Sequence, residues 1–389
     1  MARVYSVIRV TLTGPIGSPM ALLCPKAPFR AVPEYVIEFS VSTPIAFDAA
    51  ATTELAFCVA VPAESKVTRS AATVGKVTFM KIIIAGGTGF LGAPLAEMYA
   101  EDGHDVRVLT RSLESGDTRH DPGTGVPGIT RVGWKADGSA GPWAAVVEGA
   151  DAVVNLSGES LAAKRWSEES KKRMRESRVL ATRSLASAIV AAKTPPAVLI
   201  SGSGVDYYGP SHGQPRTESD PAGTDFLGQL CADWEQEARK AERPGTRVVL
   251  LRTGMVLERS GGALPEMMRP FRFFVGGPIG SGRQFVSWIH RLDWIEIVRW
   301  IVQTPIVSGP VNATAPHPVT NRHFSRALGR AMHRPSLVPA PGFAVKIVVG
   351  EFANTILTGQ RALPARAQKD GYHFRYPEIE QAFRGIFGD

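Results

Sequence analysis

Four glycines that follow a short apolar run near residue 80 have the spacing of a loop that binds a diphosphate. Residues 82–84 precede them as an isoleucine run typical of a buried strand. Glycine permits a tight turn and lets the backbone approach a pyrophosphate, and the start of a following helix offers unpaired N–H groups. The residues expected to contact a dinucleotide are Gly86, Gly87, Thr88, Gly89, Phe90, Leu91 and Gly92.

A basic residue stands where selection between the two nicotinamide dinucleotides usually occurs. NAD sites carry Asp or Glu about 20 residues beyond the glycines, where it binds the ribose 2′-hydroxyl. This chain has Arg111 and Ser112 there. A guanidinium can bind a 2′-phosphate that a carboxylate would repel. The sequence therefore favours NADP(H), with NAD(H) as the second option. The alternative is that Arg111 is a solvated loop arginine.

Alternating strand and helix patterns continue beyond this loop and must position it. The further strand candidates are 106–109, 129–132, 152–156, 198–200 and 247–251. The helix candidates are 95–99, 143–148, 167–192, 226–242, 294–302, 343–358 and 378–387. Such repeated units predict an α/β fold with a Rossmann-type doubly wound parallel sheet, which binds ligands at the carboxyl ends of its strands. The tail is expected to form a small, mostly helical substrate or cap region.

The first 79 residues do not continue this pattern. They contain short strand-like pieces such as 35–41 and 55–61, and no long helical period. We expect a poorly structured, irregular extension. The alternative is an upstream stretch read from a start codon placed too early, because Met80 directly precedes the first core strand. The expected domains are therefore 1–79, a nucleotide-binding domain over 80–310 and a C-terminal domain over 311–389.

Composition is typical of a soluble globular protein, with 44% hydrophobic and 21% charged residues. The net charge of +8 does not indicate nucleic-acid binding, because many basic residues fall within 164–183, interleaved with glutamates at helical spacing. Cys24, Cys58 and Cys231 lack metal-site spacing and favour a cytoplasmic location. No apolar run is long enough to span a membrane. The expected partners are a small-molecule substrate and, as an option, a second copy in a homodimer.

Further motifs combine into a specific pattern along the rest of the chain. They are Asn-Leu-Ser-Gly-Glu at 155–159, Ser-Gly-Ser-Gly-Val-Asp-Tyr-Tyr-Gly at 201–209, Leu-Arg-Thr-Gly-Met-Val-Leu at 251–257, Ser-Trp-Ile-His at 287–290 and Gly-Gln-Arg-Ala-Leu-Pro-Ala-Arg at 359–366. With the glycine loop, they resemble the extended short-chain dehydrogenase/reductases, and within these the atypical epimerase-like subgroup of NAD(P)-dependent epimerase/dehydratases. The tail is similar to the C-terminal domain of unknown function that accompanies this subgroup.

The resemblance implies an active site in which the usual proton-transfer groups are replaced. The superfamily uses a Ser or Thr to polarise a carbonyl, a Tyr four residues before a Lys to exchange a proton, and an Asn upstream. Ser203 matches the first group, but Leu227 and Cys231 occupy the Tyr and Lys positions, and Arg178 stands where the Asn would be. The resemblance also implies cofactor contacts from Asn155, Leu156, Ser157 and Gly158.

Two tyrosines beside Ser203 could supply a phenol for proton transfer. Tyr207 and Tyr208 follow the same strand, and Arg178 could lower a phenol pKa there. The alternatives are structural, with Ser203 capping a turn and the tyrosines and Cys231 packing in the core.

Charged residues near the fourth strand could also take part. Glu159 is the best-placed carboxylate for acid–base work, with a surface loop position as its alternative. Lys164 and Arg165 could join Arg178 in binding an anionic substrate or a cofactor phosphate. His290 and Asp293 are expected to help close the substrate lobe.

Two functions follow from these residues. The first is an NADP(H)-dependent oxidoreductase or epimerase that acts on a small carbonyl or sugar-like substrate. The alternative is a non-catalytic NADP(H)-binding redox sensor or interaction module, which keeps the cofactor site without the Tyr–Lys pair.

Overall fold

The computed structural model describes residues 9–11, 36–38, 79–114, 118–120, 128–161 and 165–388. The chain divides into two units, Met1–Phe79 and Met80–Asp389. In the first unit, strand β1 (Arg9–Thr11) pairs antiparallel with β2 (Val36–Glu38). Strand β2 falls within the strand-like piece predicted at 35–41, whereas the piece at 55–61 lies outside the described residues.

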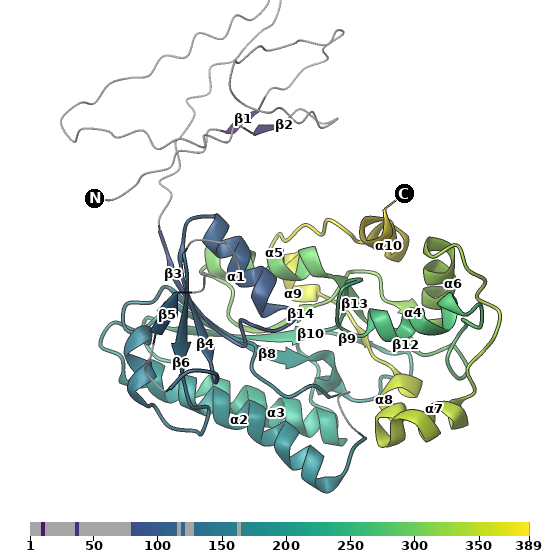
Figure 1. Cartoon of the computed structure of the whole chain (residues 1–389), viewed down its shortest axis with the longest axis horizontal. Helices are drawn as coiled ribbons and strands as arrows, with labels where there is room; N and C mark the ends of the chain where they lie inside the picture. Colours follow the sequence, from purple (N-terminus) through teal and green to yellow (C-terminus); the bar gives the residue numbers. More distant parts are fainter. Residues whose placement is uncertain are drawn as a thin grey trace, which may run out of the picture. The chain divides into compact units, whose positions relative to one another are not determined.

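An eight-stranded sheet forms the centre of the second unit (Figure 1), with the strand order β14-β10-β8-β7-β3-β4-β6-β5. Its strands are β3 (Lys81–Ala85), β4 (Asp105–Thr110), β5 (Thr118–His120), β6 (Ile129–Gly133), β7 (Ala152–Asn155), β8 (Val198–Gly204), β10 (Arg247–Thr253) and β14 (Gly309–Ala313). All neighbours pair parallel except β5, which runs antiparallel to β6 at the edge. The predicted Rossmann-type parallel sheet is confirmed, although neither β5 nor β14 is among the predicted strands.

Helices cover both faces of this sheet, α1 and α5 above it in Figure 1 and α2 and α3 below it. They are α1 (Gly92–Glu101), α2 (Glu168–Ala191), α3 (Phe226–Arg239) and α5 (Arg291–Gln303). Both faces are covered because β3 carries apolar side chains on each of them. Successive side chains of a strand point to opposite faces. Ile82 packs in one core with Leu95 of α1 and Ile297 of α5. Its neighbour Ile83 packs in the other core with Leu185 of α2.

The long helices begin at side-chain caps that the sequence provides. The Ser167 hydroxyl accepts a hydrogen bond from the Ser170 N–H at 3.2 Å, and the Ser170 hydroxyl accepts one from the Ser167 N–H at 2.7 Å. The Asp225 carboxylate accepts from the Gly228 N–H at 3.1 Å and starts α3. Such caps satisfy N–H groups that have no partner within the helix. They fix where α2 and α3 begin.

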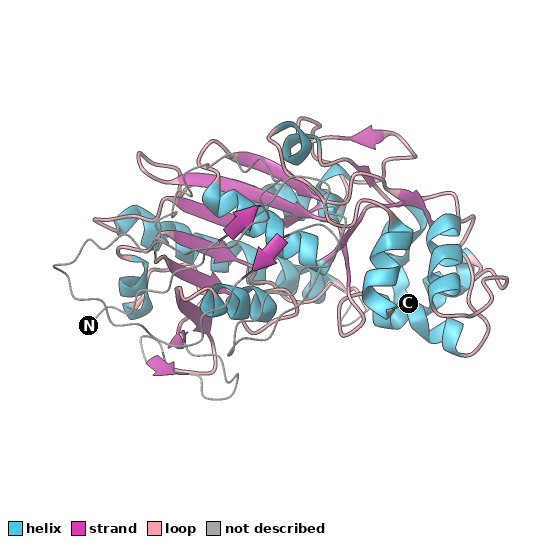
Figure 2. Cartoon of the chain, turned by 90° about the horizontal axis from the view of Figure 1, so that it is seen from above, coloured by secondary structure: helices cyan, strands magenta, loops and turns pink. Residues whose placement is uncertain are grey.

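A helical region lies at one end of the sheet (Figure 2). Its buried side chains form a third apolar core. Its main helices are α4 (Leu264–Arg272), α6 (Asn321–Ala331) and α10 (Ile379–Phe387), with the short α9 (Ala365–Lys369) beside β14. Small strand pairs join it to the rest, namely β11 (Met255–Leu257) with β13 (Trp288–His290), β12 (Phe285–Val286) with β15 (Val319–Thr320), and β9 (Pro215–Arg216) with β16 (Arg361–Ala362). The domain boundary predicted between residues 310 and 311 falls inside β14, which belongs to the main sheet.

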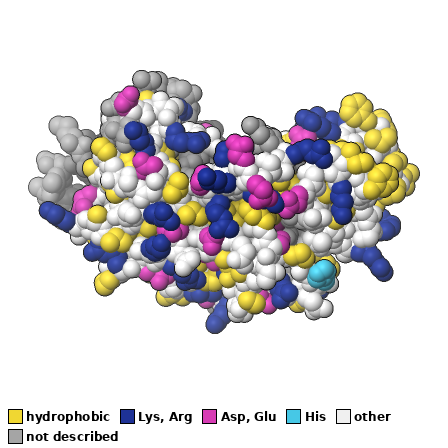
Figure 3. Space-filling model, turned by 90° about the horizontal axis from the view of Figure 1, so that it is seen from below, with side chains coloured by type: hydrophobic (Ala, Val, Ile, Leu, Met, Phe, Trp, Pro, Cys, Tyr) yellow, Lys and Arg dark blue, Asp and Glu magenta, His cyan; other side chains and the backbone are white. Residues whose placement is uncertain are grey.

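The prediction of a single helix over 343–358 is wrong. The segment forms α7 (Gly342–Val349), the 3₁₀ turn η3 (Gly350–Phe352) and α8 (Ala353–Thr358). Gly350 has φ of 68°, a left-handed conformation that ends an α-helix. Exposed apolar side chains, among them Phe343 and Ile347, gather at the end of the molecule that carries α7 (Figure 3). No described helix has both the length and the apolarity needed to cross a membrane.

The Asp293 carboxylate joins the C-terminal segment to helix α5. Asp293, in the first turn of α5, accepts hydrogen bonds from the backbone N–H groups of Arg375 at 2.8 Å and Tyr376 at 2.9 Å. The Tyr372 hydroxyl donates to the same carboxylate at 3.3 Å. The His290 ring stacks on the Tyr376 ring with centroids 4.0 Å apart. These contacts join His290 and Asp293 to the C-terminal segment, and their expected part in closing the substrate lobe stays a prediction.

Candidate functional site

The glycine loop connects β3 to α1 at the carboxyl edge of the sheet. A Cβ on Gly86, whose φ is 81°, would lie 2.7 Å from the Leu156 carbonyl oxygen. A Cβ on Gly92 would lie 2.2 Å from the Gly86 carbonyl oxygen, and one on Gly87 would lie 2.8 Å from the Val108 side chain. These positions therefore require glycine. Helix α1 then begins without a side-chain cap, and its Ala93 N–H donates to the Gly89 carbonyl of the loop at 3.0 Å. The positive dipole end of the helix at this point favours an anion.

The loop lies at the point where the strand order reverses. Strand β3 has β4 on one side and β7 on the other. The chain proceeds outward from β3 through β4 to β6, and then crosses back to β7 on the opposite side of β3. Ligands of open α/β sheets bind in the crevice at such a switch point. Phe90 of the loop packs against Gly261 and Gly262, where an added Cβ would lie 2.5 Å and 2.9 Å from its ring. The stretch that contains Gly261 and Gly262 thus borders the dinucleotide loop.

Arg111 is exposed at the end of β4 and makes no hydrogen bond or ion pair with any described residue. Next to it, the hydroxyls of Thr110 and Ser112 lie 2.9 Å apart, and the Ser112 N–H donates to the Thr110 hydroxyl at 3.3 Å. A basic side chain and two hydroxyls therefore stand where an NAD site carries a carboxylate.

The end of β7 lies next to the loop and is held by its own polar contacts. The buried Asn155 amide donates to the Thr182 hydroxyl at 2.8 Å and accepts from the Ser157 N–H at 3.2 Å. The Leu156 N–H donates to the Ala85 carbonyl at 2.8 Å. A Cβ on Gly158 would lie 3.0 Å from the Arg178 guanidinium carbon. The motif at 155–159 thus connects the dinucleotide loop with Arg178.

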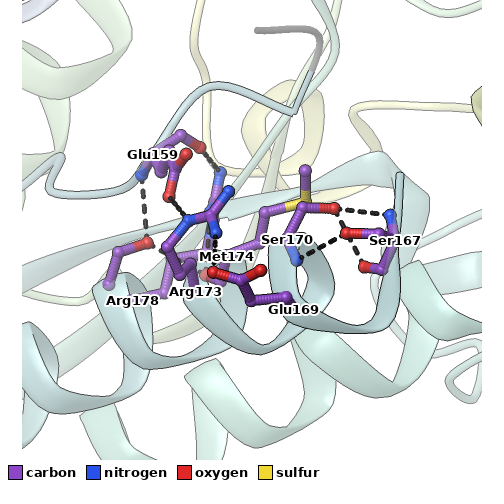
Figure 4. Close-up of polar contacts among 8 residues, drawn as sticks. Glu159, Ser167, Glu169, Ser170, Arg173, Met174 and Arg178 are labelled. Atoms are coloured by element: carbon purple, nitrogen blue, oxygen red, sulfur yellow. Dashed lines mark hydrogen bonds and ion pairs between the residues drawn. The ribbon is translucent and has the colours of Figure 1, made fainter. Parts of the chain in front are cut away.

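Arg178 is buried on α2 and turns toward Glu159 (Figure 4). Its guanidinium donates to the Glu159 carbonyl at 2.9 Å and to the Met174 carbonyl at 3.0 Å, and lies over the Trp234 ring. The Glu159 carboxylate faces Arg173 instead, with the closest N–O distance at 3.6 Å. Glu159 therefore stands as a partly exposed surface acid.

Ser203 and Tyr208 belong to a buried polar network. The Ser203 hydroxyl donates to the Glu235 carboxylate at 2.8 Å, and the same carboxylate accepts two hydrogen bonds from Arg252, at 2.8 Å and 2.9 Å. Arg252 also donates to the Tyr208 hydroxyl at 3.0 Å, which in turn donates to Asn312 at 2.7 Å. Burial raises the pKa of Tyr208 to about 12, so its phenol stays protonated at neutral pH.

The cation beside both tyrosines is Arg252, where the sequence analysis predicts Arg178. The Arg252 guanidinium carbon lies 3.4 Å from the centre of the Tyr207 ring and 5.1 Å from that of Tyr208. Its positive charge opposes the effect of burial on the pKa of Tyr208 but does not outweigh it. The cation does not bring the Tyr208 phenol into the range of a general base at neutral pH.

A second polar group, Asp206, is absent from the predicted site. It is the second residue of the 3₁₀ turn that follows β8 and lies near Cys231 of α3. Its carboxylate accepts a hydrogen bond from the Gln360 amide at 3.1 Å. Burial and then the neighbouring Asp225 carboxylate raise the pKa of Asp206 to about 6. Burial and then Asp206 raise the pKa of Cys231 to about 12. The sequence signal was an acid directly after a strand at the ligand-binding edge of the sheet.

The remaining predicted positions are Leu227, Arg165 and Lys164. Leu227 is buried in a small apolar cluster with Met174 and Leu230. Arg165 lies against Gly350, and Lys164 is outside the described residues. No cluster of metal-ligating side chains occurs among the residues that the structure describes. A surface depression of about 470 Å³ opens beside the site, lined by residues of 208–225 that include Tyr208 and Asp225.

Comparison with known families identifies the chain. The model of the NAD dependent epimerase/dehydratase family matches residues 82–312. The chain belongs to this family. A domain of unknown function, DUF1731, matches residues 340–386. The predicted resemblance is therefore confirmed.

Relatives in this epimerase family span most of the second unit. An epimerase family protein SDR39U1 homolog from Arabidopsis thaliana, described as chloroplastic, is 38% identical over 80% of this chain and 88% of its own length. YfhF from Bacillus subtilis is 37% identical over 80% of this chain and 99% of its own. The crystal structure of human SDR39U1 isoform 2 with NADPH is 35% identical, with a TM-score of 0.71 over 80% of this chain and 100% of that one.

Proposed function

We propose that the chain binds NADP(H) at the loop 86–92 and catalyses oxidation or reduction at a carbonyl or hydroxyl carbon of a small, sugar-like substrate. The observation that carries the proposal is the glycine loop at the switch point, followed at the end of β4 by an exposed arginine that has no partner among the described residues. The similar human SDR39U1 structure, which was determined with NADPH, supports it.

The residues of the loop fit a dinucleotide phosphate. The glycines would hold the diphosphate against the start of α1, and Arg111 with Ser112 would hold the 2′-phosphate. The stretch 155–158 would border the nicotinamide half. When bound, the nicotinamide donates or accepts a hydride. The protein must then orient the reacting carbon and provide or remove a proton.

A specific observation favours a second function, that of a non-catalytic NADP(H) sensor. Ser203 and Tyr208 are held within the network around Arg252, and Leu227 is buried among apolar side chains. None of these groups is arranged as the Tyr–Lys pair of the superfamily would be. A chain of this kind could bind the dinucleotide without turning it over.

One experiment separates the two functions. NADPH and NADH are titrated into the full chain by fluorescence, and NADPH oxidation is then followed over a panel of aldehydes, ketones and nucleotide sugars. We expect NADPH to bind more tightly than NADH and to be oxidised with a subset of the panel. Binding without turnover on any compound supports the sensor. Absence of binding to either dinucleotide refutes both functions.

A further inference from the structure

Three segments distant in sequence bring polar side chains together at the carboxyl end of β8. Helix α2 contributes Arg178, helix α3 contributes Cys231, and the turn η2 (Val205–Tyr208) contributes Asp206. Gly204 lies beside Asp206 and Cys231, since a Cβ there would be 3.6 Å from the Asp206 carboxylate and 3.8 Å from the Cys231 sulfur. A fourth segment, near the end of the chain, contributes Gln360, whose amide donates to Asp206.

Unlike Glu235 and Glu159, Asp206 pairs with no described cation within 4.0 Å. Glu235 is bound by Arg252, and Glu159 faces Arg173. The Asp206 side chain has one hydrogen bond from a neutral amide and stays partly accessible. A carboxylate that is neither neutralised nor fully enclosed can exchange a proton with a ligand.

We propose that Asp206 is the proton-exchanging residue of this site and takes the place of the absent tyrosine. This inference rests on the proposed function. During reduction, the substrate oxygen forms an O–H bond as the O–H bond of the Asp206 carboxylic acid breaks, and the carboxylate regains a proton from water. During oxidation, the carboxylate removes the proton of the substrate hydroxyl. The hydride in each direction is exchanged with the nicotinamide.

The surroundings suit this role. Four groups face Asp206: Asp225 at the start of α3, Cys231 on α3, Arg178 on α2, and Gln360 in the C-terminal segment. Burial and Asp225 raise the pKa of Asp206 to about 6, so both protonation states exist near neutral pH. The Cys231 thiol stays neutral because its pKa is about 12, and it adds no competing charge. Arg178 and Gln360 act as positioning residues, since both favour the charged form.

The test compares full-length wild type with Asp206→Asn and with a matched control, Asp233→Asn. Asp233 lies on the same helix as Cys231 but pairs with Arg175. We expect Asp206→Asn to lower kcat by about 100-fold or more, as loss of a general acid–base residue does, and to leave the Kd for NADPH within twofold. The control should keep wild-type kcat.

A second measurement follows the protonation of the Asp206 carboxyl in the absence of cofactor and substrate. Infrared difference spectra of the free protein between pH 5 and pH 7.5 should show a carboxylic acid band that titrates near pH 6, and this band should be missing in Asp206→Asn. In wild type, kcat for reduction should fall as pH rises through about 6, because the acid form is needed, and kcat for oxidation should fall as pH decreases through it.

The outcomes separate the two proposals. Wild-type kcat in Asp206→Asn, or a wild-type spectrum without the band, overturns the role of Asp206 and leaves the proposed function intact. A wild type that binds NADPH but oxidises it with no compound of the panel removes both the oxidoreductase function and this inference. Loss of NADPH binding in Asp206→Asn would show a structural effect and also contradict the inference.

Discussion

Replacing Arg111 with alanine is the most direct test of the dinucleotide preference. The side chain is exposed and has no protein partner among the described residues, so its removal should leave the melting temperature unchanged. A hydrogen bond to a charged group contributes about 1.5–3 kcal/mol. Because 1.4 kcal/mol corresponds to a tenfold change in affinity, Arg111→Ala should weaken NADPH binding by about 10- to 150-fold, and solvent screening favours the lower end.

The assay is fluorescence titration with NADPH and NADH side by side. NADH has no 2′-phosphate, so its affinity should stay constant in Arg111→Ala. Arg272→Ala serves as the control, because Arg272 is also an exposed arginine but lies at the end of α4. Equal losses for NADPH and NADH, or unchanged NADPH affinity, would refute the reasoning that Arg111 binds the 2′-phosphate.

Three further predictions concern stability and the loop. Arg252→Met leaves the buried Glu235 carboxylate unpaired and should lower the free energy of unfolding by about 3–5 kcal/mol in urea titrations, and a loss under 1 kcal/mol would contradict it. Gly86→Ala should abolish NADPH binding. Gly149→Ala should keep it, because Gly149 also has a positive φ, of 65°, but no atom lies within 4 Å of the added Cβ. Equal binding by the two variants would contradict the close-approach argument. Burial lowers the pKa of His290 to about 4, so the unfolded chain binds more protons between pH 6.5 and 4. Wild type should lose on the order of 2 kcal/mol more than His290→Asn when pH falls from 7 to 5, and parallel pH curves would argue against it.

The parts of the site that depend on local spacing could be predicted from the sequence. The glycines follow an apolar strand and precede a helix, so Gly86 and Gly92 are recognisable without knowledge of distant residues. The same holds for the caps at Ser167 and Asp225, which signal helix starts within a few residues. Local signals thus predict the sheet except for β5 and β14, its covering helices and the dinucleotide loop.

The parts that depend on distant pairs could not be predicted. Arg252 reaches Glu235 across 17 residues and the Tyr208 hydroxyl across 44 residues, and no local pattern marks it as the cation of the site. Asp206 stands beside two tyrosines that are more conspicuous candidates in the sequence. Its amide partner, Gln360, lies 154 residues away. Strand β5 is short and pairs only at the sheet edge, and Gly350 interrupts an otherwise continuous apolar helix pattern.

The hydrogen bond from Gln360 to Asp206 has a consequence for how the molecule is assembled during translation. Strands β3 to β8 emerge from the ribosome first and can pair in order, because domains generally fold from the N-terminal side as they are made. The Asp206 carboxylate acquires its amide partner only after residue 360 has left the ribosome. A prematurely terminated chain that ends before this residue would contain every residue of the glycine loop, but it would lack the amide that contacts the Asp206 carboxylate.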